Sequence, residues 1–282
     1  MKKLKDLFSL IRFELPVAAG ICVVLGQLSA LGYFAPLILT ISAALSVFFI
    51  SASILVSNDY FDIETDKINA PHRPIPSGLV SPAQALALAI FLLLTGLILS
   101  FRISMAALLF SIGLAIIGLL YNRNFKKHGL LGNLMVSFSV GMTFVFGGLS
   151  VGMPFNKVVL FFAVIATLVD LGEEIAADSM DVKGDKLIDS KSLAIKYGKE
   201  KALRVSAFIF VFVILLSLIP FLLGWFNIVY LIPIAVMDLF IGYSTFRLVR
   251  SKDEEGRKYI RLLYLGATFG LVVFLVMRMM GL

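Results

Sequence analysis

The sequence predicts an all-α fold, a polytopic membrane helical bundle of about nine transmembrane helices that forms a single domain over residues 1–282. Three observations predict this fold. The 282 residues are 60% hydrophobic and only 15% charged, whereas a soluble domain holds roughly 45–50% apolar and about 25% charged residues. The apolar residues gather in runs long enough for a helix to cross a hydrocarbon core of roughly 30 Å. Lysine and arginine are distributed very unevenly between the connections.

The nine expected spans are long apolar runs separated by segments that contain turn-forming residues. Gly32 and Pro36 separate the first two runs, and Gly152 and Pro154 separate the fifth from the sixth. Glycine and proline punctuate helices in this way, and short connections join antiparallel neighbours in helical bundles. The expected spans are residues 15–33, 36–57, 82–101, 104–121, 130–151, 157–177, 203–223, 226–246 and 260–281.

The positive charge of the chain predicts its orientation. Of the 25 Lys and Arg residues, 22 lie at the N-terminus and in the even-numbered connections, which leaves Arg102, Lys157 and Arg278 on the opposite side. Because positively charged loops stay in the cytoplasm, we expect a multi-pass protein of the cell membrane with a cytoplasmic N-terminus and an outside C-terminus. The net charge of +7 then reflects topology and attraction to anionic membrane lipid, so we expect no nucleic-acid partner. The sequence leaves the oligomeric state open.

An aspartate pattern occurs twice, directly after the second and sixth expected spans. The spacing D-x-x-D-x-x-x-D is found at Asp59, Asp62 and Asp66 and again at Asp178, Asp181 and Asp185. At about 100° per residue these positions share one helical stripe, where carboxylates repel one another unless a cation lies between them. Mg²⁺ prefers oxygen ligands, commonly carboxylates completed by substrate phosphates. We therefore expect all six aspartates to bind Mg²⁺ on the cytoplasmic side.

Basic residues on the same side are candidates for binding a diphosphate directly. They are Arg73, Lys126, Lys127 and Lys191. Arginine grips phosphate with two parallel hydrogen bonds, whereas lysine acts as a point charge. A diphosphate held by metal is a better leaving group, and its departure from an allylic prenyl chain leaves a carbocation. That cation needs an apolar pocket without water, which a membrane protein with 25 Phe and 8 Tyr can supply.

Five motifs follow one another along the chain, all on the expected cytoplasmic side. They are N-D-x-x-D-x-x-x-D at residues 58–66, N-x-P-x-R-P-I-P-S-G at 69–78, Y-N followed by Lys126 and G-N at 121–133, D-x-x-D-x-x-x-D at 178–185, and K-S-L at 191–193. Over nearly its whole length the chain thus resembles the UbiA superfamily of intramembrane prenyltransferases. The short loops and the R-P-I-P-S-G segment are most similar to the archaeal enzymes of ether-lipid synthesis.

The resemblance implies a UbiA-type fold and a magnesium-dependent prenyltransferase. The expected reaction transfers a geranylgeranyl group from its diphosphate to the sn-2 hydroxyl of geranylgeranylglyceryl phosphate, a lipid phosphate acceptor, through an allylic carbocation. Asp62 is a candidate base for the hydroxyl proton, although the diphosphate itself could take it. Asn58 heads the first motif and is a second catalytic candidate. Tyr121 is a candidate substrate-lining residue or an interfacial aromatic.

Two alternatives to this reaction stay open. The same fold could use an aromatic or tetrapyrrole acceptor, as in quinone or chlorophyll-type synthesis. The chain departs from the family pattern at Arg12–Leu15 and at Glu173–Asp178, so the acceptor pocket is the least defined part of the site. A transporter or divalent-cation channel is the remote alternative. Transporters place polar groups and broken helices near the midplane, whereas this sequence concentrates acids and bases on one face.

Overall fold

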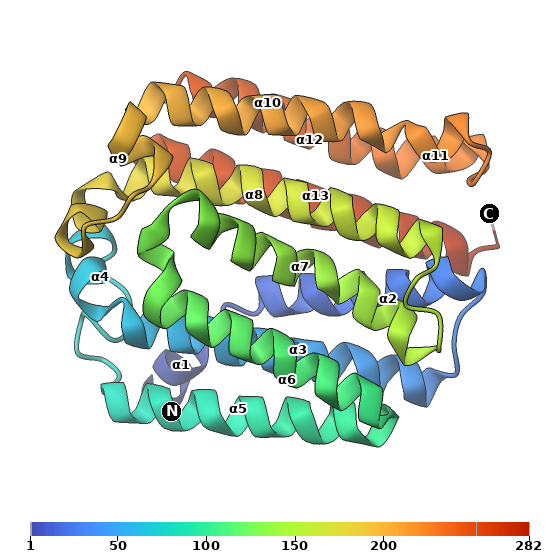
Figure 1. Cartoon of the computed structure of the whole chain (residues 1–282), viewed down its shortest axis with the longest axis horizontal. Coiled ribbons are helices and arrows are strands. Elements are labelled where there is room, and N and C mark those ends of the chain that lie inside the picture. The colour runs from blue at the N-terminus through green and yellow to red at the C-terminus, as the bar shows by residue number, and fades with distance from the viewer. Residues whose placement is uncertain (1, 252, 282) are drawn as a thin grey trace.

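The chain is described by a computed structural model that covers residues 2–251 and 253–281. These residues form helices joined by loops, and none of them belongs to a β-strand. The long helices run nearly parallel to one another in a single bundle (Figure 1). The prediction of an all-α bundle is therefore confirmed.

Nine long helices among the described residues correspond to the nine expected spans. They are α2 (Glu14–Leu31), α3 (Leu37–Phe61), α5 (Pro82–Ile103), α6 (Met105–Leu120), α7 (Leu130–Ser150), α8 (Lys157–Asp185), α10 (Lys199–Ser217), α12 (Leu231–Val249) and α13 (Asp253–Met279). The short elements are α1 (Lys2–Ser9), α4 (Ile63–Asn69), α9 (Leu193–Tyr197), α11 (Ile219–Leu222), the π-helical turn η1 (Tyr121–Phe125), and the 3₁₀ turns η2 (Lys126–His128), η3 (Lys186–Ile188) and η4 (Ile228–Tyr230).

Helix α8 differs in composition from the other long helices. Eight helices in the described part of the chain are long and apolar enough to cross a membrane, and they match eight of the nine expected spans. Helix α8 has 29 residues but carries Asp170, Glu173 and Glu174 within its apolar run. These side chains line an internal cavity, which is where ionisable groups within a membrane are tolerated.

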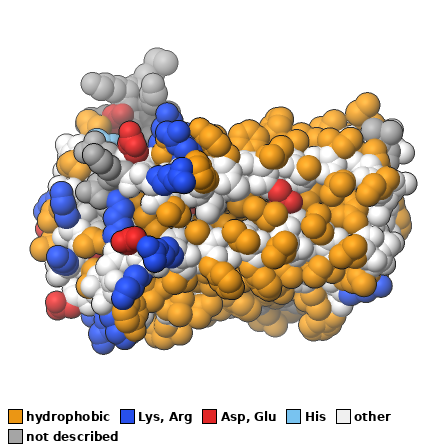
Figure 2. Space-filling view, turned by 90° about the horizontal axis from the view of Figure 1, so that it is seen from above, with side chains coloured by type: hydrophobic (Ala, Val, Ile, Leu, Met, Phe, Trp, Pro, Cys, Tyr) orange, Lys and Arg blue, Asp and Glu red, His pale blue; other side chains and the backbone are white. Residues whose placement is uncertain are grey.

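The surface divides into an apolar belt and a charged end. Lysine and arginine side chains gather at the end of the bundle where α4 and α9 lie, while hydrophobic side chains cover most of its length (Figures 1 and 2). Such a belt is expected for helices that face lipid. The chain is therefore a multi-pass membrane protein. The assignment of the charged end to the cytoplasm stays a prediction.

Helix α7 packs closely between α2 and α8. A Cβ added at Gly147 would lie 2.2 Å from the Val23 carbonyl oxygen, and one added at Gly141 would lie 2.4 Å from the Ala163 carbonyl oxygen. Small residues permit such close backbone approach in membrane bundles. The contacts hold α8, which carries the second aspartate motif, at a fixed position beside the first helices of the bundle.

Candidate active site

The first aspartate motif lies across a bend between α3 and α4. Helix α3 ends at Phe61, and Asp62 at the junction has φ −92° and ψ 9°. Helical hydrogen bonds continue through the bend: the Asp62 amide donates to the Asn58 carbonyl at 2.9 Å, and the Asp66 amide donates to the Asp62 carbonyl at 2.8 Å. The predicted helical stripe of carboxylates therefore persists, with one bend in its middle.

Two arginines neutralise the outer aspartates of this motif. Arg73 donates to Asp66 at 2.6 Å and to Asp59 at 3.4 Å. Arg12, in the loop before α2, also forms an ion pair with Asp59, which is only 2% exposed. Arg12 has a positive φ of 49°, a conformation that costs energy for a residue with a side chain. The ion pair with Asp59 stabilises Arg12 in this position.

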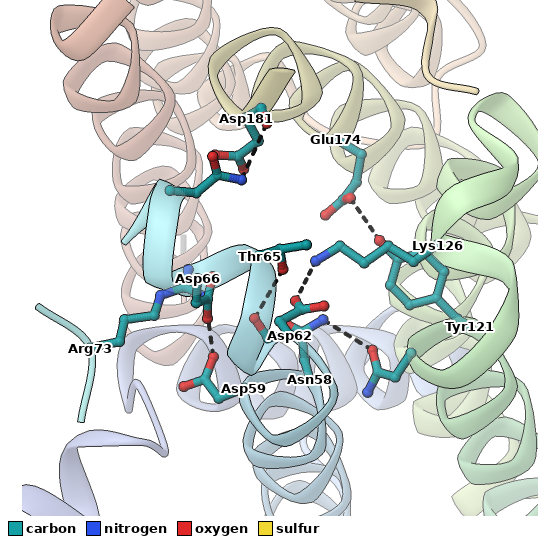
Figure 3. Close-up of polar contacts among 12 residues, drawn as sticks. Asn58, Asp59, Asp62, Thr65, Asp66, Arg73, Tyr121, Lys126, Glu174 and Asp181 are labelled. Carbon is teal, nitrogen blue, oxygen red and sulfur yellow. Dashed lines mark hydrogen bonds and ion pairs between the residues drawn. The ribbon is translucent and has the colours of Figure 1, made fainter. Parts of the chain in front are cut away.

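Lys126 reaches the middle aspartate of the motif from a π-helical turn. The Lys126 amide donates to the Tyr121 carbonyl, five residues earlier. A π-helical turn is wider than an α-helical one and occurs frequently at functional sites. It places Tyr121 and Lys126 on the same side, so that Lys126 forms an ion pair with Asp62 while the Tyr121 hydroxyl donates to Glu174 at 3.2 Å (Figure 3).

Asn58 is held beside this group by amide hydrogen bonds. Its side-chain nitrogen donates to the Asn122 side-chain oxygen at 3.2 Å, and Asn122 donates in turn to the Ile54 carbonyl at 2.9 Å. Figure 3 shows Asn58 next to Asp62 and Lys126. Asn58 lines the same cavity as Lys126, so both side chains can contact a bound ligand.

The second aspartate motif belongs to α8 itself. The expected span ended at residue 177, but the helix continues through Asp185. Asp178 accepts a hydrogen bond from the Asn133 side chain at 3.0 Å, and Asp181 forms an ion pair with Arg257 of α13. Asp185 makes no ion pair with a described residue, and burial raises the pKa of its carboxyl to about 7.

Asn69 joins the two motifs. Its side-chain nitrogen donates to the Asp181 carbonyl at 3.2 Å, and its side-chain oxygen accepts from the Gly184 amide at 2.9 Å. A Cβ at position 184 would lie 2.6 Å or less from the Asn69 side-chain amide, so glycine is required for this contact. The end of α4 is thereby fixed against α8, and the two aspartate motifs face each other (Figure 3).

A cavity of 550 Å³ extends from the aspartates into the bundle, a volume typical of ligand-binding sites. Its polar end is lined by Asp66, Arg73, Lys126, Asp178, Asp181 and Asp185. Its deeper part is lined by apolar side chains that include Leu25, Phe144, Phe161, Phe162 and Phe274. The arrangement suits an amphiphile with an anionic head and a long apolar chain.

Lys127 and Lys191 lie at the edge of this site. Both side chains are exposed, and neither lines the cavity. Their backbones are joined, because the Lys191 amide donates to the Lys127 carbonyl at 2.8 Å. The expectation that these two lysines bind diphosphate stays a prediction.

The donor groups fit a hard divalent cation. All six expected metal ligands are carboxylates, and four of them line one cavity, which is the oxygen-only chemistry that Mg²⁺ prefers. In the conformation described, no group of three His, Cys, Asp or Glu side chains within residues 2–251 and 253–281 is arranged to hold an ion. Asp59, Asp62, Asp66 and Asp181 are paired with Arg or Lys instead.

Several residues outside the predicted set contribute to the site. Asn69 and Asn133 belong to motifs that the sequence showed, and Arg12 and Glu174 lie in the two segments that depart from the family pattern. Arg257 had no distinguishing signal, because it is one of several basic residues in the eighth connection. Only the pairing of Arg257 with Asp181 in space identifies it.

Comparison with known proteins identifies the family. The UbiA prenyltransferase family model matches residues 17–277. The chain is 34% identical over 255 residues to digeranylgeranylglyceryl phosphate synthase of Methanocaldococcus jannaschii, covering 90% of this chain and 89% of that protein. It is 33% identical over 278 residues to the enzyme of the same name from Saccharolobus solfataricus, covering 97% and 96%. The chain belongs to the UbiA prenyltransferase family.

Solved structures agree with this assignment. A structure described as that of digeranylgeranylglyceryl phosphate synthase in membranes matches with a TM-score of 0.70 and 34% identity, over 98% of each chain. An apo UbiA homologue from Aeropyrum pernix matches with a TM-score of 0.83 and 18% identity, over 95% of this chain and 98% of that one. An Archaeoglobus fulgidus homologue bound to GPP and Mg²⁺ matches with a TM-score of 0.65 and 20% identity, over 95% and 99%. The last two similarities concern the fold alone.

Proposed function

We propose that the chain transfers a geranylgeranyl group from geranylgeranyl diphosphate to the sn-2 hydroxyl of geranylgeranylglyceryl phosphate, in ether-lipid synthesis of the archaeal type. One observation carries the proposal: two aspartate motifs and their cationic partners face each other at the polar end of an apolar cavity within a membrane bundle. The names of the relatives at 34% and 33% identity support the choice of acceptor.

The charged groups at the cavity divide into those that bind metal and those that bind phosphate. The six aspartates would hold Mg²⁺, which when bound neutralises the negative charge that develops on the departing diphosphate. Arg73 and Lys126 bind diphosphate oxygens, exchanging their aspartate partners for phosphate. Arg12 is a third such group, since it shares Asp59 with Arg73. Lys127 and Lys191, at the edge of the site, attract the diphosphate by long-range electrostatics.

The apolar part of the cavity holds the prenyl chain and excludes water from the carbocation. Phe144 and Phe162 are stacked with ring centroids 5.9 Å apart, and Phe161 lies 5.5 Å from Phe162. Aromatic faces attract cations and, unlike water, the phenyl ring of Phe carries no oxygen lone pair that could capture the allylic cation. The aromatic lining therefore both accommodates the isoprenoid tail and protects the intermediate from hydrolysis.

The reaction exchanges one C–O bond for another. The bond between C1 of the prenyl chain and the diphosphate oxygen breaks, and the acceptor hydroxyl oxygen forms the new bond to C1. The hydroxyl proton passes to Asp62, beside which Asn58 lies, or to the departing diphosphate. Tyr121, fixed by Glu174, lines the space in which the two substrates meet.

The charged end of the bundle is proposed to face the cytoplasm. The support is the sequence distribution, in which 22 of 25 Lys and Arg residues lie on that side. Single cysteines introduced at Lys127 and near Met280, in a background without Cys22, should be labelled by an impermeant thiol reagent from opposite sides of sealed cells. Labelling of both positions from the same side would contradict this topology.

The function is tested by a transfer assay in detergent with labelled geranylgeranyl diphosphate and Mg²⁺. Geranylgeranylglyceryl phosphate and 4-hydroxybenzoate are offered together as acceptors. We expect a product that depends on metal and forms with the glyceryl phosphate alone. A prenylated aromatic product would retain the mechanism and overturn the acceptor. Absence of product with either would point to a tetrapyrrole acceptor or to a transporter.

A further inference from the structure

One face of helix α13 packs against neighbouring helices, and another face lines the cavity. Tyr259 and Leu263 are buried on the first face, where Tyr259 packs with Ala176 of α8. Arg257 and Tyr264, seven residues apart, both line the cavity. Positions 257, 261 and 264 share one helical stripe, so Arg261 lies on the same side of α13 as these two residues, one turn along the helix from Arg257, at the edge of the cavity and not in its lining.

The side chains of both arginines on this stripe are exposed to solvent to a large degree. Arg257 pairs with Asp181, yet its side chain is 43% exposed, and Arg261 pairs with Glu14 at 3.5 Å while 67% exposed. Glu14 also accepts from the Tyr264 hydroxyl at 3.4 Å. Both Glu14 contacts are long for hydrogen bonds. The guanidinium groups can therefore turn toward an anion without loss of a strong buried interaction.

These arginines are distinct from the cations of the diphosphate site. Arg12, Arg73 and Lys126 all pair with aspartates of the first motif. Arg257 pairs with the second motif, and Arg261 pairs with the start of α2. The proposed reaction brings two phosphorylated molecules to one cavity, and the cations in and beside its polar end form two groups.

The cavity wall below Arg261 suits the tail of a lipid. Helix α2 contributes Leu15, Ala18 and Ala19, and α13 contributes Ala267 and Leu271. This apolar wall begins directly below Glu14 and Tyr264. An amphiphile whose phosphate contacts the two arginines would therefore place its isoprenoid chain along the seam between α2 and α13.

We propose that Arg257 and Arg261 bind the phosphate of the acceptor lipid, at a subsite separate from the diphosphate site. The subsite selects a prenylated glycerol that carries a phosphate over one that lacks it, and it sets the position of the acceptor hydroxyl. The proposal rests on the function proposed above. Since Mg²⁺ bound by Asp181 would compete with Arg257 for that carboxylate, metal also strengthens binding of the acceptor.

Equilibrium binding without the donor tests this subsite separately from catalysis. Labelled geranylgeranylglyceryl phosphate and labelled geranylgeranylglycerol are bound to detergent-solubilised protein, with and without Mg²⁺. Charge-assisted hydrogen bonds contribute enough that we expect Arg257→Gln and Arg261→Gln each to weaken binding of the phosphorylated lipid about tenfold. The double variant should bind the two lipids alike. Mg²⁺ should tighten binding of the phosphorylated lipid to the wild type.

Controls separate a phosphate contact from a structural effect. Lys258→Gln removes the same charge from an exposed neighbour that lies about 100° around the helix from Arg257, and it should bind as the wild type does. Arg261→Lys should retain most of the affinity, and Arg261→Gln should leave binding of geranylgeranyl thiodiphosphate, an unreactive donor analogue, unchanged. Equal weakening of donor and acceptor, or wild-type acceptor binding by the double variant, would overturn the subsite.

Two further outcomes distinguish the subsite from general lipid binding and from the proposed function. If phosphatidylglycerol displaces the acceptor as well as unlabelled acceptor does, the arginines bind bilayer lipid and the subsite is overturned. If the wild-type protein transfers no geranylgeranyl group to the glyceryl phosphate, the proposed function fails, whatever the arginine variants bind. Transfer by the wild type together with unchanged acceptor binding in the variants overturns the subsite alone.

Discussion

The two aspartate motifs have the same spacing but opposite electrostatic surroundings. In the first motif every carboxylate is paired with a cation, and the cations come from three different segments of the chain. In the second motif, among the described residues, Asp181 alone has a cationic partner, Asp178 accepts from the Asn133 amide, and burial raises the pKa of Asp185 to about 7. One sequence pattern thus produces a neutralised site and an under-neutralised site that face each other.

The difference has a structural origin. The first motif bends at Asp62, and the following loop folds back so that Arg73 reaches both Asp59 and Asp66. The second motif lies on a straight helix whose neighbours present the Asn133 amide and the exposed Arg257. The protein's own cations thus neutralise the first motif, whereas the second motif has one cationic partner, Arg257, among the described residues.

Loss of either motif should abolish transfer. Asp62→Ala and Asp181→Ala should each lower kcat by about 10³-fold or more, because removal of a metal ligand withdraws several kcal/mol of transition-state stabilisation. The assay is transfer of labelled geranylgeranyl at saturating acceptor. Both variants should elute from size exclusion as the wild type does. Normal turnover in either variant would exclude the metal site proposed here.

Two adjacent lysines should differ strongly in effect. Lys126→Ala should lower kcat/KM by about 100-fold, because it removes a charge-assisted contact within the cavity. Lys127→Ala and Lys191→Ala should lower it by less than about threefold, since both side chains are exposed and act through long-range attraction that salt screens. Steady-state kinetics at low and high salt measure both effects. If Lys127→Ala lowered kcat/KM as much as Lys126→Ala does, and the decrease persisted in high salt, Lys127 would contact the diphosphate directly.

The stability of the metal-free protein should respond differently to the two motifs. Asp59→Asn leaves Arg12 and Arg73 without their shared carboxylate, and we expect a destabilisation of about 2 kcal/mol, less than for a fully buried pair because both arginines are partly exposed. Asp185→Asn leaves no ion-paired cation behind among the described residues and should change stability by less than about 0.5 kcal/mol. Thermal unfolding in detergent with a chelator measures both. Equal destabilisation by the two substitutions would contradict the proposed difference in charge neutralisation between the motifs.

The helical bundle and the gathering of the motifs at one end could be predicted from the sequence. The length of an apolar run and the turn residues that follow it, such as Gly152 and Pro154, are local properties of the sequence. The distribution of Lys and Arg between the connections indicates which connections lie on the same side of the membrane. The end of α8 could not be placed this way. The helix continues eight residues beyond the expected end at 177 because contacts from other helices, including Asn69 and Asn133, stabilise its polar last turns.

The cationic partners of the aspartates were the least predictable feature. Arg73 lies close to its partners in sequence and was expected at the site, whereas Arg12 is 47 residues from Asp59 and Arg257 is 76 residues from Asp181. Nothing local distinguishes Arg257 from residues that only set topology, and the only sequence signal for Arg12 is that its segment departs from the family pattern. Their roles follow from how the helices pack, which neither periodicity nor composition specifies.

The last expected effect concerns how metal and diphosphate act together. Mg²⁺ alone must compete with Arg12, Arg73 and Lys126 for the first motif, and pyrophosphate alone meets six carboxylates. When both are present, the cations can transfer to phosphate as the aspartates bind metal. We therefore expect Mg²⁺ with pyrophosphate to raise the melting temperature by more than the sum of the separate shifts, within the roughly 3 kcal/mol available at 100 times Kd.

Scanning fluorimetry in detergent measures these shifts in melting temperature. Asp181→Asn serves as the control, and in this variant Mg²⁺ with pyrophosphate should raise the melting temperature by no more than the sum of the separate shifts. Simple additivity in the wild type would mean that metal and diphosphate bind without any exchange of ion-pair partners. The three cations would then stay on the first motif throughout catalysis. Arg73 and Lys126 would act by positioning the aspartates, and the phosphate contacts would have to come from other residues, with Arg257, which lines the cavity beside the second motif, as one candidate.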